Sequence, residues 1–342
     1  MTEKDKKVLI LGGTGAMGVY LVPELLSMGY QVHVAALDGF ESLPRDNLRL
    51  SCTNCNAKDE DTLRRLLKAE YDAVVDFMIY GTEEFRKRYQ LFLENTDHYI
   101  FFSSYRVYAG QTPVSENSPR LLDVSDDKEF LATEDYALYK AREEDILMQS
   151  GYLNWTAVRP AITYSKRRFQ LVTLEAAVVV HRMLCGKTLI LPQEAMPVQG
   201  TMTWAGDVAK MLARLVLNKD AYRGIFTVST AEHHTWKEIA GYYKKIGGLN
   251  YITVDADTYI NVIAEGDRHA KWQLSYDRLF DRVIDNRKIL NITGLKQADF
   301  MPLYDGLKME LSALPRDFDW SGMVHYNINE RMDAYLKKRG LN

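Results

Sequence analysis

The chain has 342 residues, of which 46% are hydrophobic and 26% are charged, and its formal net charge is −3 at pH 7. These values are typical of a globular protein with one large or two modest domains. A slightly acidic chain has no overall positive field that would attract nucleic acid or anionic lipid, so neither partner is expected. No apolar run approaches the length of a membrane span, and we expect a cytoplasmic protein.

The first half of the chain alternates short apolar runs with helical patterns. Such repeated strand–helix units predict an α/β fold with a doubly wound parallel sheet and right-handed crossovers. Strands are expected at 8–11, 31–37, 48–52, 73–78, 99–103 and 155–159, and helices at 16–28, 59–69, 83–95 and 133–149.

After Pro160 the alternation loosens. We expect a Rossmann domain over 1–165, to which segments around 200–230 return, and a smaller, partly interleaved α+β substrate lobe over 166–342. In such folds ligands bind outside the carboxyl ends of the strands. In this half helices are expected at 169–185, 207–217, 236–246 and 303–313, and strands at 188–191, 225–229 and 251–254.

A glycine turn follows the first predicted strand and opens the first predicted helix. Gly12, Gly15 and Gly18 give the spacing G-x-x-G-x-x-G. Glycines let the backbone approach a pyrophosphate closely, and the amides and dipole of the helix N-terminus face its negative charge. A lone glycine pattern is weak, but this one has a strand before it and a helix after it. The turn therefore predicts dinucleotide binding.

Asp38 ends the second predicted strand, 20 residues after Gly18. A carboxylate there accepts hydrogen bonds from the ribose hydroxyls of the adenosine half and repels a 2′-phosphate. The nearest basic residue is Arg45. The pattern favours NAD over NADP, although Asp38 could also simply open a turn with the glycine that follows it.

Two further elements supply polar groups for chemistry. Tyr136 and Lys140 lie at i and i+4 of a predicted helix and therefore share a face. A nearby ammonium favours the phenolate form of a tyrosine and makes it a usable general acid/base. Ser103 and Ser104 end the fifth predicted strand, where a hydroxyl can stabilise a reacting oxygen. Each element alone also occurs by chance, on a solvated helix face or at a strand end.

In this order the elements resemble the short-chain dehydrogenase/reductase superfamily, in its extended branch of NAD-dependent epimerases and dehydratases. The similarity extends over about residues 7–312. Besides the glycine turn it is carried by Ser103-Ser104-Tyr105-Arg106-Val107-Tyr108, the Y-x-x-x-K of Tyr136 to Lys140, Val158-Arg159-Pro160, Gly206-Asp207-Val208-Ala209 and Tyr304-Asp305-Gly306-Leu307.

The resemblance implies a role for each matching residue. Ser104 would bind the reacting oxygen, Tyr136 would act as general acid/base, and Lys140 would hydrogen-bond the nicotinamide ribose. Asn56 stands where the family usually has Asp. The implied cofactor-binding residues are Gly12, Gly15, Ala16, Met17, Gly18, Asp38, Asn56, Ala57, Phe77, Met78, Ile79, Ser103, Tyr136, Lys140, Pro160 and Ile162.

Two departures from the family pattern concern the substrate. Sugar-nucleotide 4,6-dehydratases have an acidic pair after the catalytic serine or threonine, where this chain has Tyr105 and Arg106, which argues against that elimination. Many relatives also place an Arg before the D-V-A segment, whereas 199–204 contains none. The basic run Lys166-Arg167-Arg168 could contact phosphate instead, or be a solvated loop. Candidate substrate residues are Tyr105, Tyr164, Arg168 and Trp204.

Three cysteines are present, Cys52, Cys55 and Cys185, and this odd, low number fits a reducing compartment. Cys52 and Cys55 have the C-x-x-C spacing, but zinc needs two more ligands and there is no second cysteine pair. We therefore expect reduced structural thiols and no metal.

The sequence thus predicts an NAD-dependent oxidoreductase or epimerase that acts on a hydroxyl of a sugar or sugar nucleotide. One alternative is a carbonyl reductase without sugar specificity. Another is a non-catalytic binding protein, as some RNA-associated relatives in chloroplasts are. The retained Ser104, Tyr136 and Lys140 favour the enzyme. Because the family often pairs the helices expected at 83–95 and 133–149, a homodimer is expected.

Overall fold

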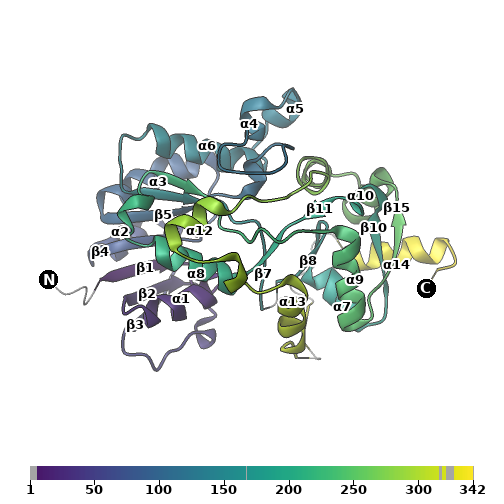
Figure 1. Cartoon of the computed structure of the whole chain (residues 1–342), viewed down its shortest axis with the longest axis horizontal. Helices are drawn as coiled ribbons and strands as arrows, with labels where there is room; N and C mark the ends of the chain where they lie inside the picture. The colour runs from purple at the N-terminus through teal and green to yellow at the C-terminus, as the bar shows by residue number, and fades with distance from the viewer. Residues whose placement is uncertain (1–5, 167, 316–317, 321–326, 342) are drawn as a thin grey trace.

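A seven-stranded sheet forms the larger part of the molecule, at the left of Figure 1, in a computed structural model that describes residues 6–166, 168–315, 318–320 and 327–341. The strand order is β13-β6-β5-β4-β1-β2-β3, and every neighbouring pair is parallel. This is the doubly wound arrangement, so the predicted fold class is confirmed. The strands are β1 (Lys7–Leu11), β2 (Gln31–Ala36), β3 (Leu50–Asn54), β4 (Tyr71–Asp76), β5 (Thr96–Phe102), β6 (Trp155–Val158) and β13 (Gly224–Phe226).

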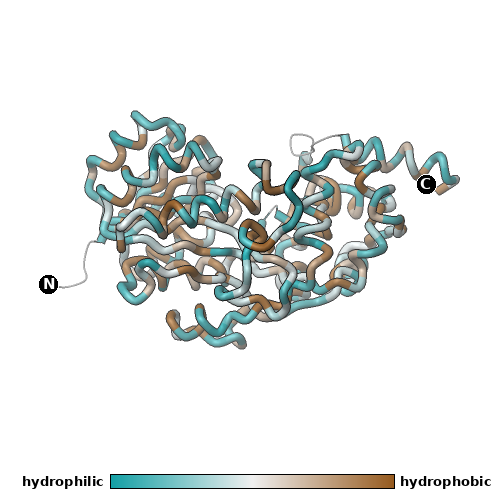
Figure 2. The backbone as a smooth tube through the Cα atoms, turned by 90° about the horizontal axis from the view of Figure 1, so that it is seen from above, coloured by the Kyte–Doolittle hydropathy of each residue, from teal (hydrophilic) through white to brown (hydrophobic). Residues whose placement is uncertain are grey.

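Alternate residues of β1 face opposite sides of the sheet. Val8 and Ile10 join one hydrophobic core, whereas Leu9 and Leu11 join another, and all four are fully buried. Burial on both faces explains why this run is continuously apolar. In Figure 2 the hydrophobic strands lie inside this part of the molecule. The first face is covered by α1 (Gly18–Ser27), α8 (Ala205–Leu215) and α12 (Arg287–Thr293), and the second by α2 (Glu60–Leu67), α3 (Thr82–Glu94) and α6 (Tyr136–Gln149).

Two segments from the second half of the chain join this larger part. β13 runs parallel to β6, and α8 packs against α1. β13 ends at Phe226, three residues before the end of the strand predicted at 225–229. The domain limits 1–165 and 166–342 stay a prediction.

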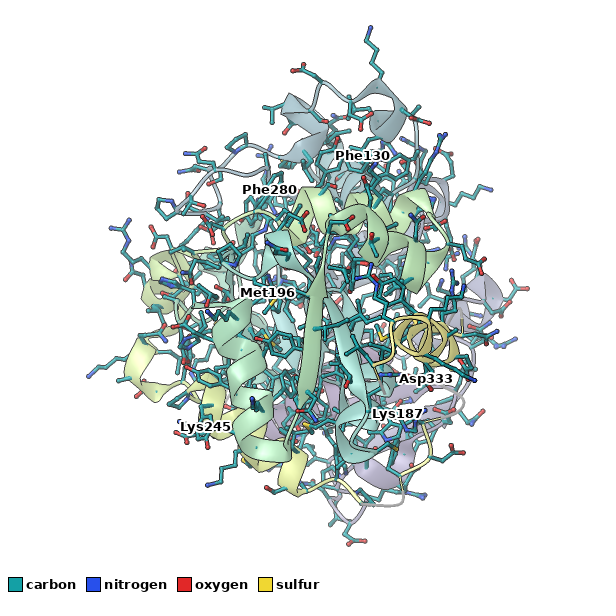
Figure 3. All side chains as sticks on the ribbon, turned by 90° about the vertical axis from the view of Figure 1, so that its right-hand side faces the viewer. Phe130, Lys187, Met196, Lys245, Phe280 and Asp333 are labelled. Atoms are coloured by element: carbon teal, nitrogen blue, oxygen red, sulfur yellow. The ribbon has the colours of Figure 1, made fainter. Side chains whose placement is uncertain are left out.

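The smaller lobe lies at the right of Figure 1 and is built around the parallel pair β10 and β15. Its last helix, α14, is held by Asp333, which accepts hydrogen bonds from Arg182 and Lys187 at 2.8 and 2.5 Å. Figure 3 shows Lys187 and Asp333 side by side. The elements are α7 (Ala176–Leu184), β10 (Thr188–Pro192), α9 (Trp236–Gly247), β15 (Asn250–Val254), α10 (Ala256–Ala264), α11 (Arg268–Gln273), the π-helix η5 (Leu274–Arg278), α13 (Leu303–Ser312) and α14 (Ile328–Lys338).

Short elements connect the two parts or lie beside them. β7 pairs with β12 in parallel, while β8 with β9 and β11 with β14 form antiparallel pairs. In the part of the chain that the structure describes, no helix is long and apolar enough to cross a membrane. The remaining bounds are α4 (Leu121–Val124), α5 (Lys128–Leu131), β7 (Ile162–Tyr164), β8 (Gln170–Leu171), β9 (Leu174–Glu175), β11 (Gln199–Gly200), β12 (Met202–Trp204) and β14 (His234–Thr235).

Two predicted helices begin later than expected. The helix predicted at 169–185 begins at Ala176, because β8 and β9 form a hairpin whose turn places Val172 at φ +54°. The helix predicted at 133–149 begins at Tyr136, because the Asp135 carboxylate accepts a hydrogen bond from the Ala137 N–H and caps it. The sequence interpretation did not include α10, α11, η5, α12 and α14.

Candidate functional site

A cavity of about 470 Å³ lies at the carboxyl ends of β1, β4, β5 and β6 and extends to the smaller lobe. This is where ligands bind in doubly wound folds. It brings together the glycine turn with Ser104, Tyr136 and Lys140. Its lining residues are Gly12, Gly15, Ala16, Met17, Gly18, Phe77, Met78, Ile79, Phe102, Ser103, Ser104, Tyr105, Arg106, Tyr136, Lys140, Pro160, Ala161, Ile162, Thr163, Arg168, Gln170, Glu175, Gln273 and Arg278.

The glycine turn requires glycine for two different reasons. Gly12 has φ +74°, and a Cβ there would clash with the Met78 methyl group. A Cβ on Gly18 would clash with the backbone of Gly13, where α1 begins. The absent side chains leave backbone amides at the cavity wall, beside a helix N-terminus, which is the cradle that a pyrophosphate needs.

The residues expected at the adenosine end do not line the cavity. Asp38 is exposed beyond β2, and the next residue, Gly39, has φ +77° and packs against Thr14 of the glycine turn. The Asn56 side chain accepts a hydrogen bond from the Lys58 N–H, and Ala57 is buried. Asp38 therefore lies at the same edge of the sheet as the turn, and the cofactor contacts of these residues stay a prediction.

Ser103 and Ser104 have different surroundings. The Ser103 hydroxyl donates to Glu144 at 2.5 Å, and that carboxylate is also held by Arg159 at 2.6 and 2.7 Å. The Ser104 oxygen accepts a hydrogen bond from the Arg106 N–H at 3.2 Å. Among the described residues no acceptor takes the Ser104 proton, so Ser104 can donate to a ligand oxygen.

Tyr136 lies in the first turn of α6 and lines the cavity, half-buried. Its ring meets the edge of Tyr139 at 5.3 Å between centroids. The guanidinium carbon of Arg106 lies 5.2 Å from the centre of the Tyr136 ring, close enough for a cation–π contact. The sequence interpretation placed Lys140 beside this phenol and did not foresee Arg106 there.

The Lys140 ammonium is buried and paired with Glu143. Nζ donates to Glu143 Oε2 at 2.9 Å and lies 4.8 Å from the centre of the Phe101 ring. Burial raises the pKa of Glu143 to about 7, with Lys140 opposing the shift and Asp76 adding to it. Burial also raises the pKa of Asp76 to about 6. The sequence interpretation missed Glu143, although an acid three residues after Lys140 was a visible signal.

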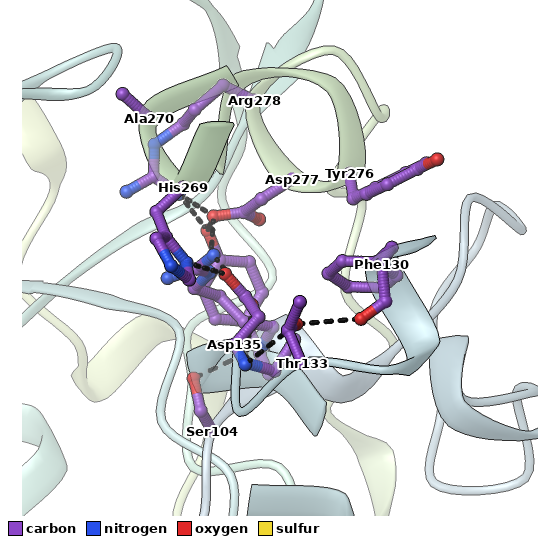
Figure 4. Close-up of polar contacts among 12 residues, drawn as sticks. Ser104, Phe130, Thr133, Asp135, His269, Ala270, Tyr276, Asp277 and Arg278 are labelled. Carbon is purple, nitrogen blue, oxygen red and sulfur yellow. Dashed lines mark hydrogen bonds and ion pairs between the residues drawn. The ribbon is translucent and has the colours of Figure 1, made fainter. Parts of the chain in front are cut away.

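The substrate end of the cavity is made largely of side chains that the sequence interpretation missed. Glu175 comes from β9, Gln273 from α11 and Arg278 from η5. Arg278 donates to Val172 O at 2.7 Å and to the Tyr105 hydroxyl at 2.7 Å, and it contacts Asp277. Figure 4 shows Asp277 and Arg278 above Asp135, with His269 beside them. No motif marks these residues, because the fold alone brings η5 to the cavity.

Of the four candidate substrate residues, two line the cavity and two do not. Tyr105 and Arg168 line it, and Arg167 lies outside the described residues. Tyr164 is fully buried with its hydroxyl against Gly306, so it packs behind the wall. Trp204 also lies away from the cavity, because its indole N–H donates to Glu310 at 2.6 Å and its ring packs on Tyr20.

The cysteines lie outside the cavity lining and are free thiols. Partial burial raises the pKa of both Cys52 and Cys55. Within the described ranges, no group of three or more His, Cys, Asp or Glu side chains is placed to hold a metal ion.

Residues 8–96 match the NAD dependent epimerase/dehydratase family. A curated relative is the "Chloroplast stem-loop binding protein of 41 kDa b, chloroplastic" of Arabidopsis thaliana, 25% identical over 260 residues. The match covers 72% of this chain and 65% of the relative, so it extends over slightly less than two thirds of the relative's length.

Solved structures, two of them named as epimerases, share the fold. The UDP-glucose 4-epimerase of Thermus thermophilus, solved with NAD, is 20% identical, with 93% of this chain and 100% of that chain covered and a TM-score of 0.63. The Bordetella bronchiseptica enzyme WbmG, solved with NAD, is 18% identical, with 91% and 94% covered and a TM-score of 0.66. The epimerase Mth375 of Methanothermobacter thermautotrophicus is 14% identical, with 98% and 95% covered and a TM-score of 0.66.

These likenesses confirm the family resemblance and the fold. Residues 8–96 thus match the NAD dependent epimerase/dehydratase family, and the chain as a whole has the fold of solved epimerases.

Proposed function

We propose that the protein is an NAD-dependent oxidoreductase or epimerase that acts on a hydroxyl group of a sugar or sugar nucleotide. One observation carries the proposal: Ser104, Tyr136 and Lys140 line the same cavity as the glycine turn. Neighbouring structures support the cofactor and the substrate class, because WbmG was solved with NAD and UDP, and the epimerase of Thermotoga maritima with UDP-glucose.

The residues of the chain fit NAD. The glycine turn would hold the pyrophosphate, and the segments after β4 and β6, with Phe77 to Ile79, Pro160 and Ile162, would contact the nicotinamide half. Asp38 would accept hydrogen bonds from the adenosine ribose. NAD, when bound, accepts a hydride from the substrate carbon.

The protein's own groups would manage the proton and the charge. As the C=O bond of the substrate forms, the Tyr136 oxygen would take the proton of the breaking hydroxyl O–H bond. Ser104 donates a hydrogen bond to the reacting oxygen, and Lys140 stabilises the negative charge that develops nearby. Reduction of the ketone on its other face before release would give the epimer, whereas release of the ketone would give dehydrogenation.

The test combines a turnover assay with a binding assay. Wild-type protein and Tyr136→Phe are incubated with NAD and a panel of sugars, sugar acids, sugar phosphates and UDP-sugars, and turnover is followed by NADH absorbance and by product analysis. We expect Tyr136→Phe to lose turnover by about 10²- to 10⁴-fold, the usual worth of a general base, while NADH still binds. Undiminished turnover in this variant would overturn the mechanism.

A stem-loop RNA-binding function is the second candidate, and the similarity to the chloroplast protein favours it. The net charge of −3 argues against it. Filter binding of a stem-loop RNA at low and high salt separates the two functions. Tight, salt-sensitive binding of the RNA that persists in Tyr136→Phe would favour an RNA-binding function. If no such binding is found, the enzymatic function is favoured.

We also propose a cytoplasmic homodimer that pairs α3 and α6 of two copies. Both helices lie side by side on one face of the sheet. Light scattering after gel filtration should give twice the 39.3 kDa mass of the chain. A monomer mass would overturn the pairing.

A further inference from the structure

The Arg106 guanidinium has no hydrogen-bond partner in the part of the chain that the structure describes. Its side chain is only 15% exposed, and its nearest carboxylates, Asp135 and Asp277, are both 3.6 Å away. Its Nε is fully buried and makes no hydrogen bond within the described residues. A guanidinium removed from water without hydrogen bonds is costly, so this group calls for a partner. Arg106 lines the cavity, and a ligand can therefore supply that partner.

The two carboxylates nearest to Arg106 are shared with other groups. Asp277 is shared with Arg278, which it contacts, and with Arg282, whose Nε donates to it at 3.2 Å. Asp135 also caps α6 through the Ala137 N–H. Both carboxylates nearest to Arg106 therefore have other partners, and the third carboxylate of the cluster, Glu175, acts on Arg278. The positive charges hold the pKa of Asp277 below its usual value despite its burial.

Arg278 and Arg106 differ in how much of their hydrogen-bonding capacity is used. Arg278 donates to Val172 O, Tyr105 and Gln170 in addition to contacting Asp277. Among the described residues, Arg106 makes the two longer ion pairs and the contact with the Tyr136 ring. The unused hydrogen-bonding capacity of this cluster is therefore on Arg106.

Arg106 also lies next to the proposed reacting groups. It follows Ser104 by two residues, its backbone N–H donates to the Ser104 oxygen, and its guanidinium lies over the Tyr136 ring at 5.2 Å. An anion bound there would be close to the hydroxyl from which Tyr136 takes a proton. The diphosphate of a nucleotide sugar is separated from a reacting hydroxyl across the sugar ring, so a group attached nearer to the reacting carbon fits this position better.

We propose that Arg106 binds a carboxylate of the substrate, and that the substrate is a hydroxy acid such as a sugar acid. The planar fork of a guanidinium matches a carboxylate in a bidentate pair. The inference rests on the proposed function, because it places the carboxylate beside the hydroxyl that is oxidised.

Calorimetric titration of the NAD-saturated protein tests the assignment. The probes are D-glucuronate, D-galacturonate and tartronate, with D-glucose, D-galactose and galactose 1-phosphate as matched comparisons. We expect at least one acid to bind while the neutral sugars do not. Arg106→Gln should weaken that binding by about 10- to 100-fold, the range for a charge-assisted pair, and leave NADH affinity within about twofold.

Two further variants make the result specific. Arg106→Lys keeps the charge but not the fork, and should recover only part of the affinity. Arg287→Gln removes an exposed arginine paired with Asp285 and should bind the acid as the wild type does. Three results would overturn the carboxylate assignment: none of the three acids binds, an acid and its neutral sugar bind equally well, or Arg106 instead confers a preference for galactose 1-phosphate. NADH binding, measured separately, shows whether the proposed function fails instead.

Discussion

The cofactor half and the substrate half of the cavity differ in how the chain builds them. Around the glycine turn the cavity is built by residues close in sequence: Gly12 has φ +74°, and a Cβ on Gly18 would clash with the backbone of Gly13. In the substrate half, side chains distant in sequence meet, as when the Tyr105 hydroxyl donates to Asp277, 172 residues away. One half depends on local backbone geometry and the other on a buried network of charges, so the two should respond to different substitutions.

The largest expected effect is on stability, from the substrate half. Asp277→Asn removes a buried carboxylate that contacts Arg278, accepts a hydrogen bond from Arg282 and lies 3.6 Å from Arg106. We expect the free energy of unfolding to fall by about 3–5 kcal/mol, the cost of breaking a buried ion cluster. Urea denaturation measures it. Asp285→Asn, at an exposed pair, should cost under about 1 kcal/mol. A comparable small loss in Asp277→Asn would contradict a buried charge network.

A substitution in the cofactor half should change the affinity for NADH. Gly12→Val places a β-branched side chain at φ +74° and against Met78, where the pyrophosphate turn must keep its shape. We expect NADH affinity to fall by on the order of 100-fold or more, as measured by fluorescence titration. Gly241→Ala is the control, because it lies in α9 with open space around its Cβ, and it should bind normally. Normal NADH binding by Gly12→Val would place the dinucleotide elsewhere.

The smallest expected effect concerns Glu143, at the boundary between the halves. Its pKa in the folded protein is about 7, above its ordinary value of 4.5, so the carboxyl takes up a proton on folding between these two pH values. The free energy of unfolding therefore falls as the pH rises from 4.5 to about 7, and levels off above that. The contribution is at most about 1.4 kcal/mol per pH unit. Asp76, with a pKa raised to about 6, acts in the same direction only below that pH.

Between pH 6 and 7 the free energy of unfolding of the wild type should decline, and Glu143→Gln should therefore lack this decline. Urea midpoints of both proteins from pH 5 to 8 give the difference. Glu60→Gln, an exposed helix pair with Arg64, should keep the wild-type slope. Identical pH profiles for wild type and Glu143→Gln would show that the buried carboxylate does not titrate there.

The same contrast explains what the sequence could predict. Glycine spacing, the apolar run before it and the i, i+4 pair Tyr136–Lys140 are local patterns. The structure makes the run a central strand and places the glycines and the pair at one cavity. The parallel sheet follows from repeated strand–helix units for the same reason. Asp38 lies at the expected edge of the sheet, and its contact with a ribose stays a prediction.

The substrate half could not be predicted in this way. Arg278 reaches the cavity through a π-helix that no periodicity indicates, and Glu175 through a hairpin in a stretch whose pattern predicts a helix. Tyr164 and Trp204 were expected in the pocket, yet the fold turns them toward Gly306 and Glu310. The direction of a side chain after a short strand depends on what packs around it, which the sequence does not display.

The central claim is that the cavity holds the dinucleotide, and its most direct test is a structure from crystals grown with NADH. The account predicts the pyrophosphate on the turn from Gly12 to Gly18, the adenosine ribose at Asp38, and the nicotinamide beside Tyr136 and Ser104 within the cavity. A dinucleotide bound elsewhere, or a cavity that stays empty at saturating NADH, would contradict it.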